Sequence, residues 1–237
     1  MQKATLGRVY VWELPVRFYH WLNALCILVL CATGFMIGAP DTLRHVSEAS
    51  YSYWFGKVRF VHFVAAYLFF FNFLFRIYWG FAGNKYAQWK NFIPYRKKQW
   101  KEIKQVIAVD VLQADNTPIE TIGHNAVAGF TYFMTFLAFL FQCITGFGLY
   151  AAMSKSWLPH LFTWIVPLMG GDFAVRQWHH AFMWFFILFA LVHVYIVFYH
   201  DYVEGRGEIS SMGGGWKFIE KEYHPILKGD KPAAKRK

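Results

Sequence analysis

The sequence predicts an all-α integral membrane protein built as a bundle of four transmembrane helices. Of its 237 residues, 57% are hydrophobic and 22% are aromatic. Charged residues make up 16% of the chain, whereas an average soluble domain has about 25%. Four stretches stay apolar over about 20 residues, the length that crosses a bilayer. A soluble helical core is the alternative, but buried soluble helices rarely stay apolar all round over such lengths.

These stretches define the expected domain organisation. The predicted spans lie at about 18–37, 60–81, 126–150 and 178–199. Residues 1–215 are therefore expected to form one transmembrane domain, followed by a basic tail at 216–237. The segment from Ser154 to Phe173 is apolar but is interrupted by Pro159 and Pro167, so we expect it to lie along the membrane interface. The N-terminus lacks the pattern of a cleavable signal peptide, so the first span is expected to be retained.

The distribution of basic residues predicts which side of the membrane each loop faces. The loop from Gly83 to Asn125 and the tail from Lys217 to Lys237 are rich in lysine and arginine. Because cytoplasmic segments carry such an excess, both termini and this loop are assigned to the cytoplasmic side. The net charge of +10 is explained by this membrane-proximal basic face, so no nucleic-acid partner is expected.

The three cysteines, Cys26, Cys31 and Cys143, all fall inside apolar spans. The sequence contains neither a CxxC nor a CxxCH motif. It therefore predicts no cysteine-ligated metal site and no covalently attached c-type haem.

Histidines inside the spans are the main candidate functional residues, because burying an ionisable side chain in a bilayer is costly. A helix places His179 and His193 about 21 Å apart along its axis and only about 40° apart around it. His180 lies about 140° from His193 on the same arithmetic, so we expect a structural or outer-surface role for it. With the predicted orientation, His62 pairs with His179 at the outer level, and His20 pairs with His193 at the inner level. For any one of them, a hydrogen bond to a neighbouring helix is the alternative.

Two histidine pairs at separate levels predict two haem sites. A neutral imidazole nitrogen is a good iron ligand, and two imidazoles from different helices can fill both axial positions of one haem. Six-coordinate iron has no vacant position for a substrate, which suits electron transfer. A zinc or copper site would need its ligands clustered at one point. A proton relay would need ionisable groups between the two levels, and few are present.

A short internal repeat relates the two halves of the chain. The first and third spans end with the same tripeptide, and the second and fourth begin with Arg-x-x-His. The matching segments are Thr33-Gly34-Phe35 with Thr145-Gly146-Phe147, and Arg59 to His62 with Arg176 to His179. Two related helix hairpins would place both pairs at the outer face. Small residues would give a haem ring room, with ordinary helix packing as the alternative; the candidates are Gly34, Gly129, Gly146 and Gly148.

Several segments carry a family resemblance. They read "PVRFYHWLNALCILVLCATGFMIG", "YWFGKVRFVHF", "RIYWGFAGNKY", "IGHNAVAG", "ITGFGLY" and "QWHHAFMW". With these segments the chain resembles the b-type cytochrome subunit of membrane-bound, uptake-type nickel-iron hydrogenases, from Tyr10 to about Met212. The formate dehydrogenase cytochrome subunits belong to the same wider family and share its four-helix, two-haem plan. "GNKY" and "GHN" favour the hydrogenase branch.

The resemblance implies the cofactors, the ligands and the partners. It implies two non-covalent b-type haems, whose four ligands fall on His20, His62, His179 and His193. The doublet formed by His179 and His180 departs from the single histidine expected in relatives, and only His179 keeps the spacing to His193. The implied location is the bacterial cytoplasmic (inner) membrane. The implied partners are a hydrogenase small subunit with iron–sulfur clusters and a nickel-iron large subunit.

The resemblance also implies a route for electrons. Electrons from H2 are expected to pass through the outer haem and then the inner haem to a quinone near the cytoplasmic face. This chain would carry out no H2 chemistry of its own.

Further polar residues are candidates for contacts with these groups. His124 and Asn125 open the third span at the inner level, where we expect them to contact the quinone; helix capping is the alternative for Asn125. Arg59, Arg76 and Arg176 are expected partners of haem propionates. Snorkelling or solvated surface charge is the alternative for these arginines.

Two other functions are left open by the residues themselves. One is a cytochrome subunit of formate dehydrogenase or of another periplasmic oxidoreductase. The other is a haem-free membrane anchor or small transporter. An optical spectrum separates the last from the first two, and reduction by H2 or by formate separates those two from each other.

Overall fold

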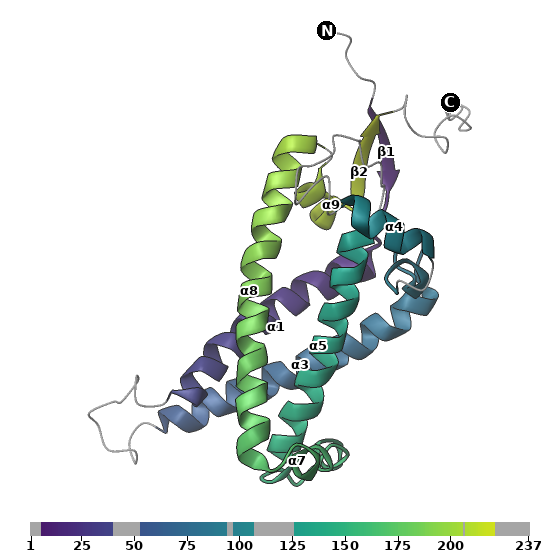
Figure 1. Cartoon of the computed structure of the whole chain (residues 1–237). Coiled ribbons are helices and arrows are strands. Elements are labelled where there is room, and N and C mark those ends of the chain that lie inside the picture. Colours follow the sequence, from purple (N-terminus) through teal and green to yellow (C-terminus); the bar gives the residue numbers. More distant parts are fainter. Residues whose placement is uncertain (1–5, 40–52, 94–96, 107–125, 206, 221–237) are drawn as a thin grey trace. The chain divides into compact units, whose positions relative to one another are not determined.

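The computed structural model describes residues 6–39, 53–93, 97–106, 126–205 and 207–220 (Figure 1). The long helices are α1 (Leu14–Gly38), α3 (Trp54–Ala82), α5 (Ala126–Ala151) and α8 (Asp172–Glu204). The shorter elements are β1 (Leu6–Tyr10), η2 (Trp89–Asn91), α4 (Lys97–Val106), α6 (Trp157–His160), α7 (Ile165–Leu168), α9 (Glu208–Gly214) and β2 (Trp216–Glu220).

The four long helices confirm the predicted fold class. Each is long and apolar enough to cross a membrane. The shortest, α1, has 25 residues, and at about 1.5 Å per residue it exceeds the roughly 30 Å of a hydrocarbon core. A helix satisfies every backbone polar group within the segment, as the bilayer interior requires. The prediction of a four-span, all-α membrane protein is therefore correct.

The outward faces of these helices are apolar. Leu28 on α1 is 68% exposed, and Phe60 on α3 is also 68% exposed. Leu188 and Phe198 show the same pattern on α8. A soluble protein rarely exposes apolar patches of this extent, whereas lipid is their natural environment.

The chain divides into two compact units, which we describe separately. The first contains Phe18–Tyr78 and Tyr132–His193, and it therefore holds the central parts of the four long helices. The second contains the described residues up to Arg17, those within Trp79–Thr131 and those from Val194 onward.

Aromatic side chains form the core of the first unit. The ring of Phe139 on α5 stacks on Phe186 of α8, with centroids 5.0 Å apart and planes 10° apart. Phe139 also meets Phe69 of α3 edge-on at 5.0 Å. Phe73 of α3 stacks on Phe136 of α5 at 4.6 Å. Aromatic pairs at such distances contribute more than their buried area alone, so they fix α3, α5 and α8 against one another.

The segment between α5 and α8, for which we expect a place along the membrane interface, contains two short helices. In α6 and α7 only four residues each are helical. A Cβ added at Gly148 of α5 would lie 2.3 Å from the Ile165 side chain and 2.9 Å from the Phe162 carbonyl. This glycine therefore lets the segment pack directly on α5.

The second unit contains a small antiparallel sheet that the sequence analysis did not predict. Strand β1 pairs with β2 in a register that runs from Leu6 opposite Glu220 to Tyr10 opposite Trp216. Gly215, which has a positive φ of 86°, precedes β2, and a Cβ there would meet the Tyr10 ring at 2.5 Å. The first five residues of the expected tail are thus ordered as a strand. Its remaining residues lie outside those that the structure describes.

Asn84 and Glu13 tie the second unit together. The Glu13 carboxylate accepts hydrogen bonds from the Trp79 indole at 3.1 Å and from the Asn84 backbone at 2.8 Å. The Asn84 side chain donates to the Val11 carbonyl at 2.9 Å and accepts from the Tyr86 backbone at 3.0 Å. These bonds connect the chain before α1 to the turn after α3.

Candidate functional site

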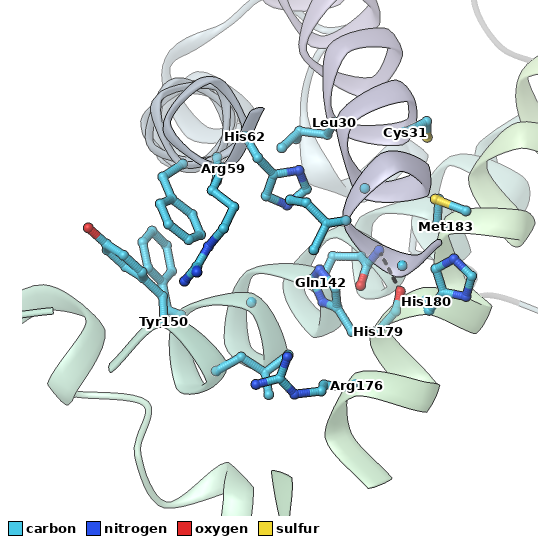
Figure 2. A pocket seen from close by; sticks show the side chains of 18 of the residues that line it. Leu30, Cys31, Arg59, His62, Gln142, Tyr150, Arg176, His179, His180 and Met183 are labelled. Carbon is cyan, nitrogen blue, oxygen red and sulfur yellow. Dashed lines mark hydrogen bonds between the residues drawn. The ribbon is translucent and has the colours of Figure 1, made fainter. Parts of the chain in front are cut away.

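The first unit contains a partly open cavity of about 610 Å³. It is lined by the C-terminal parts of α1 and α5 and by the N-terminal parts of α3 and α8, which is the level predicted to face outward. Figure 2 shows His62 of α3 and His179 of α8 at this cavity, together with Arg59 and Arg176. Its volume falls within the range of about 300–1,000 Å³ that is typical of pockets for small molecules and cofactors. The structure therefore brings the predicted outer pair to one cavity.

A threonine of α1 orients the His62 ring. Thr33 Oγ1 lies 2.8 Å from His62 Nδ1. The same hydroxyl is 2.6 Å from the Val29 carbonyl oxygen, four residues earlier on its own helix. A hydroxyl has one proton, and the carbonyl can only accept it, so the ring nitrogen must donate to the hydroxyl oxygen. His62 Nδ1 is therefore protonated, and the lone pair of Nε2 is available to a metal.

The other half of the bundle repeats this arrangement. Thr145 Oγ1 of α5 lies 2.8 Å from His179 Nδ1 and 2.8 Å from the Phe141 carbonyl oxygen. The same proton count assigns the hydrogen of the His179 ring to Nδ1. Gln142 adds a hydrogen bond from its amide to the His179 carbonyl at 3.2 Å, which Figure 2 marks as a dashed line.

The glycine after each threonine lies beside the ring that the threonine contacts. A Cβ added at Gly34 would lie 3.5 Å from His62 Cε1, which is an ordinary contact. A Cβ added at Gly146 would lie 3.1 Å from His179 Cε1, which is tighter than normal packing. The repeated tripeptide therefore places a threonine hydroxyl on an imidazole in both halves, whereas the close approach of the ring requires glycine only at Gly146.

The predicted inner pair also comes together within the first unit. The ring centroids of His20 on α1 and His193 on α8 are 6.3 Å apart, with planes inclined by 53°. Two imidazoles bound to opposite sides of one metal, through bonds of about 2 Å, have centroids roughly 6 to 6.5 Å apart. His193 stacks on Phe189 at 5.6 Å. His20 Nδ1 is buried and has no hydrogen-bond partner among the residues described. The spacing fits a histidine pair that holds a metal.

His180 differs from its neighbour in its surroundings. It lines the same cavity, but a Cβ at Gly38 would lie only 2.9 Å from its Nε2. The ring thus packs on the C-terminal end of α1, and Figure 2 shows it beside Met183. Its Nε2 is buried without a hydrogen bond in the described part of the chain. The expectation of a structural or outer-surface role for His180 stays a prediction, because the ring lines the same cavity as His179.

The three candidate arginines occupy two environments. Arg59 lies over the Phe63 ring at 5.8 Å, and Arg176 forms an ion pair with Asp172 at 2.6 Å. Both line the cavity, so they supply positive charge to it. Arg76 does not line it; it is 2% exposed and donates a hydrogen bond to the Tyr132 hydroxyl.

Some residues at the site were not predicted from the sequence. The Thr-Gly-Phe repeat was apparent, but no contact was expected for Thr33 or Thr145, and Gln142 was not a candidate. The repeat itself was the available signal, because two threonines at equivalent places opposite two histidines indicate one shared contact. The candidate quinone residues His124 and Asn125 lie outside the described residues.

A four-span helix bundle that pairs histidines from different helices at two places is typical of a membrane-bound haem cytochrome. Comparison with known proteins identifies the group. Residues 11–215 match the family described as prokaryotic cytochrome b561, and the chain belongs to this family. Membership implies b-type haem.

Its relatives include hydrogenase-associated cytochromes. The chain is 40% identical over 216 residues to a probable Ni/Fe-hydrogenase B-type cytochrome subunit of Azotobacter vinelandii, covering 90% of this chain and 89% of that protein. It is 39% identical to the protein of that name from Cupriavidus necator, over 90% and 88% of the two chains. It is 36% identical to the probable Ni/Fe-hydrogenase 1 B-type cytochrome subunit of Escherichia coli, over 88% and 90%.

Proposed function

We propose that this chain is the cytochrome subunit of a membrane-bound nickel-iron hydrogenase and passes electrons from H2 oxidation to the membrane quinone pool. The names of its relatives support the partner, because they describe Ni/Fe-hydrogenase cytochrome subunits matched over most of both chains. The proposed partners are a small subunit with iron–sulfur clusters and a large subunit with the nickel-iron centre. H2 chemistry belongs to that large subunit.

The proposal includes two b-type haems per chain. His62 and His179 would hold one haem in the cavity, and His20 and His193 would hold the other. Bound in this way, each haem supplies one-electron transfer without a vacant iron position for a substrate. The observation that carries the proposal is the matched pair of threonine contacts, in which Nδ1–H of His62 and of His179 donates to a threonine hydroxyl and Nε2 is left for iron.

The cationic side chains suit the carboxylates of a haem. Arg59 and Arg176 both line the cavity, on the helices that contribute the two histidines. A guanidinium group binds a carboxylate through paired hydrogen bonds. We therefore assign these arginines to the propionates of the outer haem. Arg76, which is buried in the same unit, is the corresponding candidate for the inner haem.

The proposed orientation puts both termini in the cytoplasm of a bacterium and the cavity toward the periplasm. In this orientation the hydrogenase small subunit docks at the level of His62 and His179. The quinone binds at the level of His20 and His193, with His124 and Asn125 as its candidate contacts. The basic loop and tail support this assignment, because positive charge gathers on the cytoplasmic side.

The direct test uses anaerobic membranes from cells that contain the chain and its native partners. H2 should produce the absorption bands of reduced b-type haem, and formate should not. Membranes with the His62→Ala/His179→Ala variant should lose the response to H2. Reduction by formate alone would assign the chain to a formate dehydrogenase. A purified chain without haem bands after haem-replete expression would reject electron transfer.

A further inference from the structure

We propose that Thr33 and Thr145 are positioning residues that lower the reduction potential of the outer haem relative to the inner one. The inference rests on the proposed function, because it takes His62 and His179 as iron ligands. It concerns the hydrogen bond on the side of each imidazole that faces away from the metal.

The two contacts have the same geometry in the two halves of the chain. Each threonine hydroxyl lies 2.8 Å from Nδ1 of its histidine. Each hydroxyl donates its proton to a carbonyl four residues earlier, to Val29 in α1 and to Phe141 in α5. A threonine in a membrane helix commonly makes this backbone bond. Here the bond has a further effect, since it turns the hydroxyl oxygen into an acceptor for the imidazole.

Both threonine side chains are buried, which protects their hydrogen bonds with the imidazoles from competition by water. Thr145 is fully buried, and Thr33 is 8% exposed. Water therefore has little access to replace either hydroxyl oxygen. A buried imidazole N–H that lost its acceptor would be left unsatisfied, which is costly. The threonines therefore fix the orientation of both imidazole rings and keep the ring proton on Nδ1.

The hydrogen bonds change the electronic character of the proposed ligands. An acceptor on the outer N–H of a metal-bound imidazole raises the basicity of the nitrogen that binds the metal. A more basic ligand stabilises ferric iron more than ferrous iron, because ferric iron has the higher charge. Acceptors on both ligands of the outer haem therefore lower its reduction potential.

The inner pair lacks at least one of these contacts. His20 Nδ1 is buried and accepts or donates no hydrogen bond within the described segments. Its partner His193 is packed against the ring of Phe189, which offers no acceptor comparable to a hydroxyl oxygen. The inner haem would therefore have the higher potential, and electrons arriving at the outer haem would move downhill to the inner one.

The test is a potentiometric titration of the purified chain, followed through the absorption bands of reduced haem. The outer haem is identified as the one that disappears in His62→Ala. Thr33→Val and Thr145→Val should each raise its potential, and the double variant should raise it further. Thr33→Ser and Thr145→Ser, which keep the hydroxyl, should restore the wild-type value. The inner haem should keep its potential in all of these variants.

Thr135→Val is the matched control, because Thr135 is also buried on α5 but does not line the cavity. It should leave the outer potential unchanged. Loss of the outer haem in the valine variants, with retention in the serine variants, would also support the positioning role. Unchanged outer potentials, equal shifts of both haems, or a Thr135→Val shift of the same size would overturn it. A failure of the proposed function would be distinguished from these outcomes, because H2 would then not reduce the haems in wild-type membranes.

Discussion

The imidazole rings of His20 on α1 and His193 on α8 lie with their centroids 6.3 Å apart, although they come from the first and last spans. This spacing leaves room for one metal between two nitrogens. His193 lies fourteen residues after His179 on α8, which is about 21 Å along the helix axis. The bundle therefore holds two separate histidine pairs that have one helix, α8, in common.

Removing the inner pair should separate the two steps of electron transfer. In His193→Ala membranes, H2 should still reduce the haem held by His62 and His179, while reduction of quinone falls to background. Haem spectra after H2 addition and a quinol assay measure the two steps. His200→Ala, seven residues further along α8, is the control and should keep quinone reduction. Normal quinone reduction in His193→Ala would contradict the assignment.

The adjacent histidines of α8 should behave differently. His179→Ala should remove about half of the bound haem, because the threonine contact prepares only this ring as a ligand. His180→Ala should keep both haems, since this ring packs on Gly38 at the end of α1. A pyridine haemochrome assay against protein concentration gives the ratio. The reverse pattern would show that the ligand at this level is His180.

The two repeat glycines should tolerate alanine unequally. Gly146→Ala brings a methyl group to 3.1 Å from His179 Cε1, whereas Gly34→Ala stays at ordinary contact distances of 3.4 Å or more. Overpacking of this kind costs about 1–3 kcal/mol. We therefore expect weaker haem retention in Gly146→Ala, measured as haem loss to an apo-globin acceptor. Faster loss from Gly34→Ala would contradict the geometry.

Asn84 should be important for stability rather than for electron transfer. Its side chain bonds the Val11 carbonyl and the backbone amides of Tyr86 and Ala87. Leaving such buried groups unsatisfied costs about 1–3 kcal/mol. Asn84→Ala should lower the thermal midpoint of the purified chain, and Asn91→Ala, at an exposed position, should lower it less. Equal effects would show that the turn after α3 does not depend on Asn84.

Sequence patterns were sufficient to predict the membrane helices and the spacing of the histidines. A long apolar stretch has few structural options in lipid, so α1, α3, α5 and α8 follow from composition. The separation of His179 from His193 along α8 follows from helix geometry. Neither inference needs knowledge of how the helices pack.

Contacts between distant segments were beyond sequence reasoning. The pairing of β1 with β2 joins residues from opposite ends of the chain, and neither strand shows a long alternating pattern of its own. The bond from Thr33 to His62 depends on which faces of α1 and α3 meet. A repeated threonine indicated equivalent positions in the two halves, but only packing shows that each hydroxyl faces an imidazole.

The central claim is that two histidine pairs each hold one haem, and haem content per chain measures it most directly. The purified wild-type chain should contain two b-type haems. His62→Ala/His179→Ala and His20→Ala/His193→Ala should each contain one, with different reduction potentials. A single haem in the wild type, or two haems in either double variant, would contradict the account.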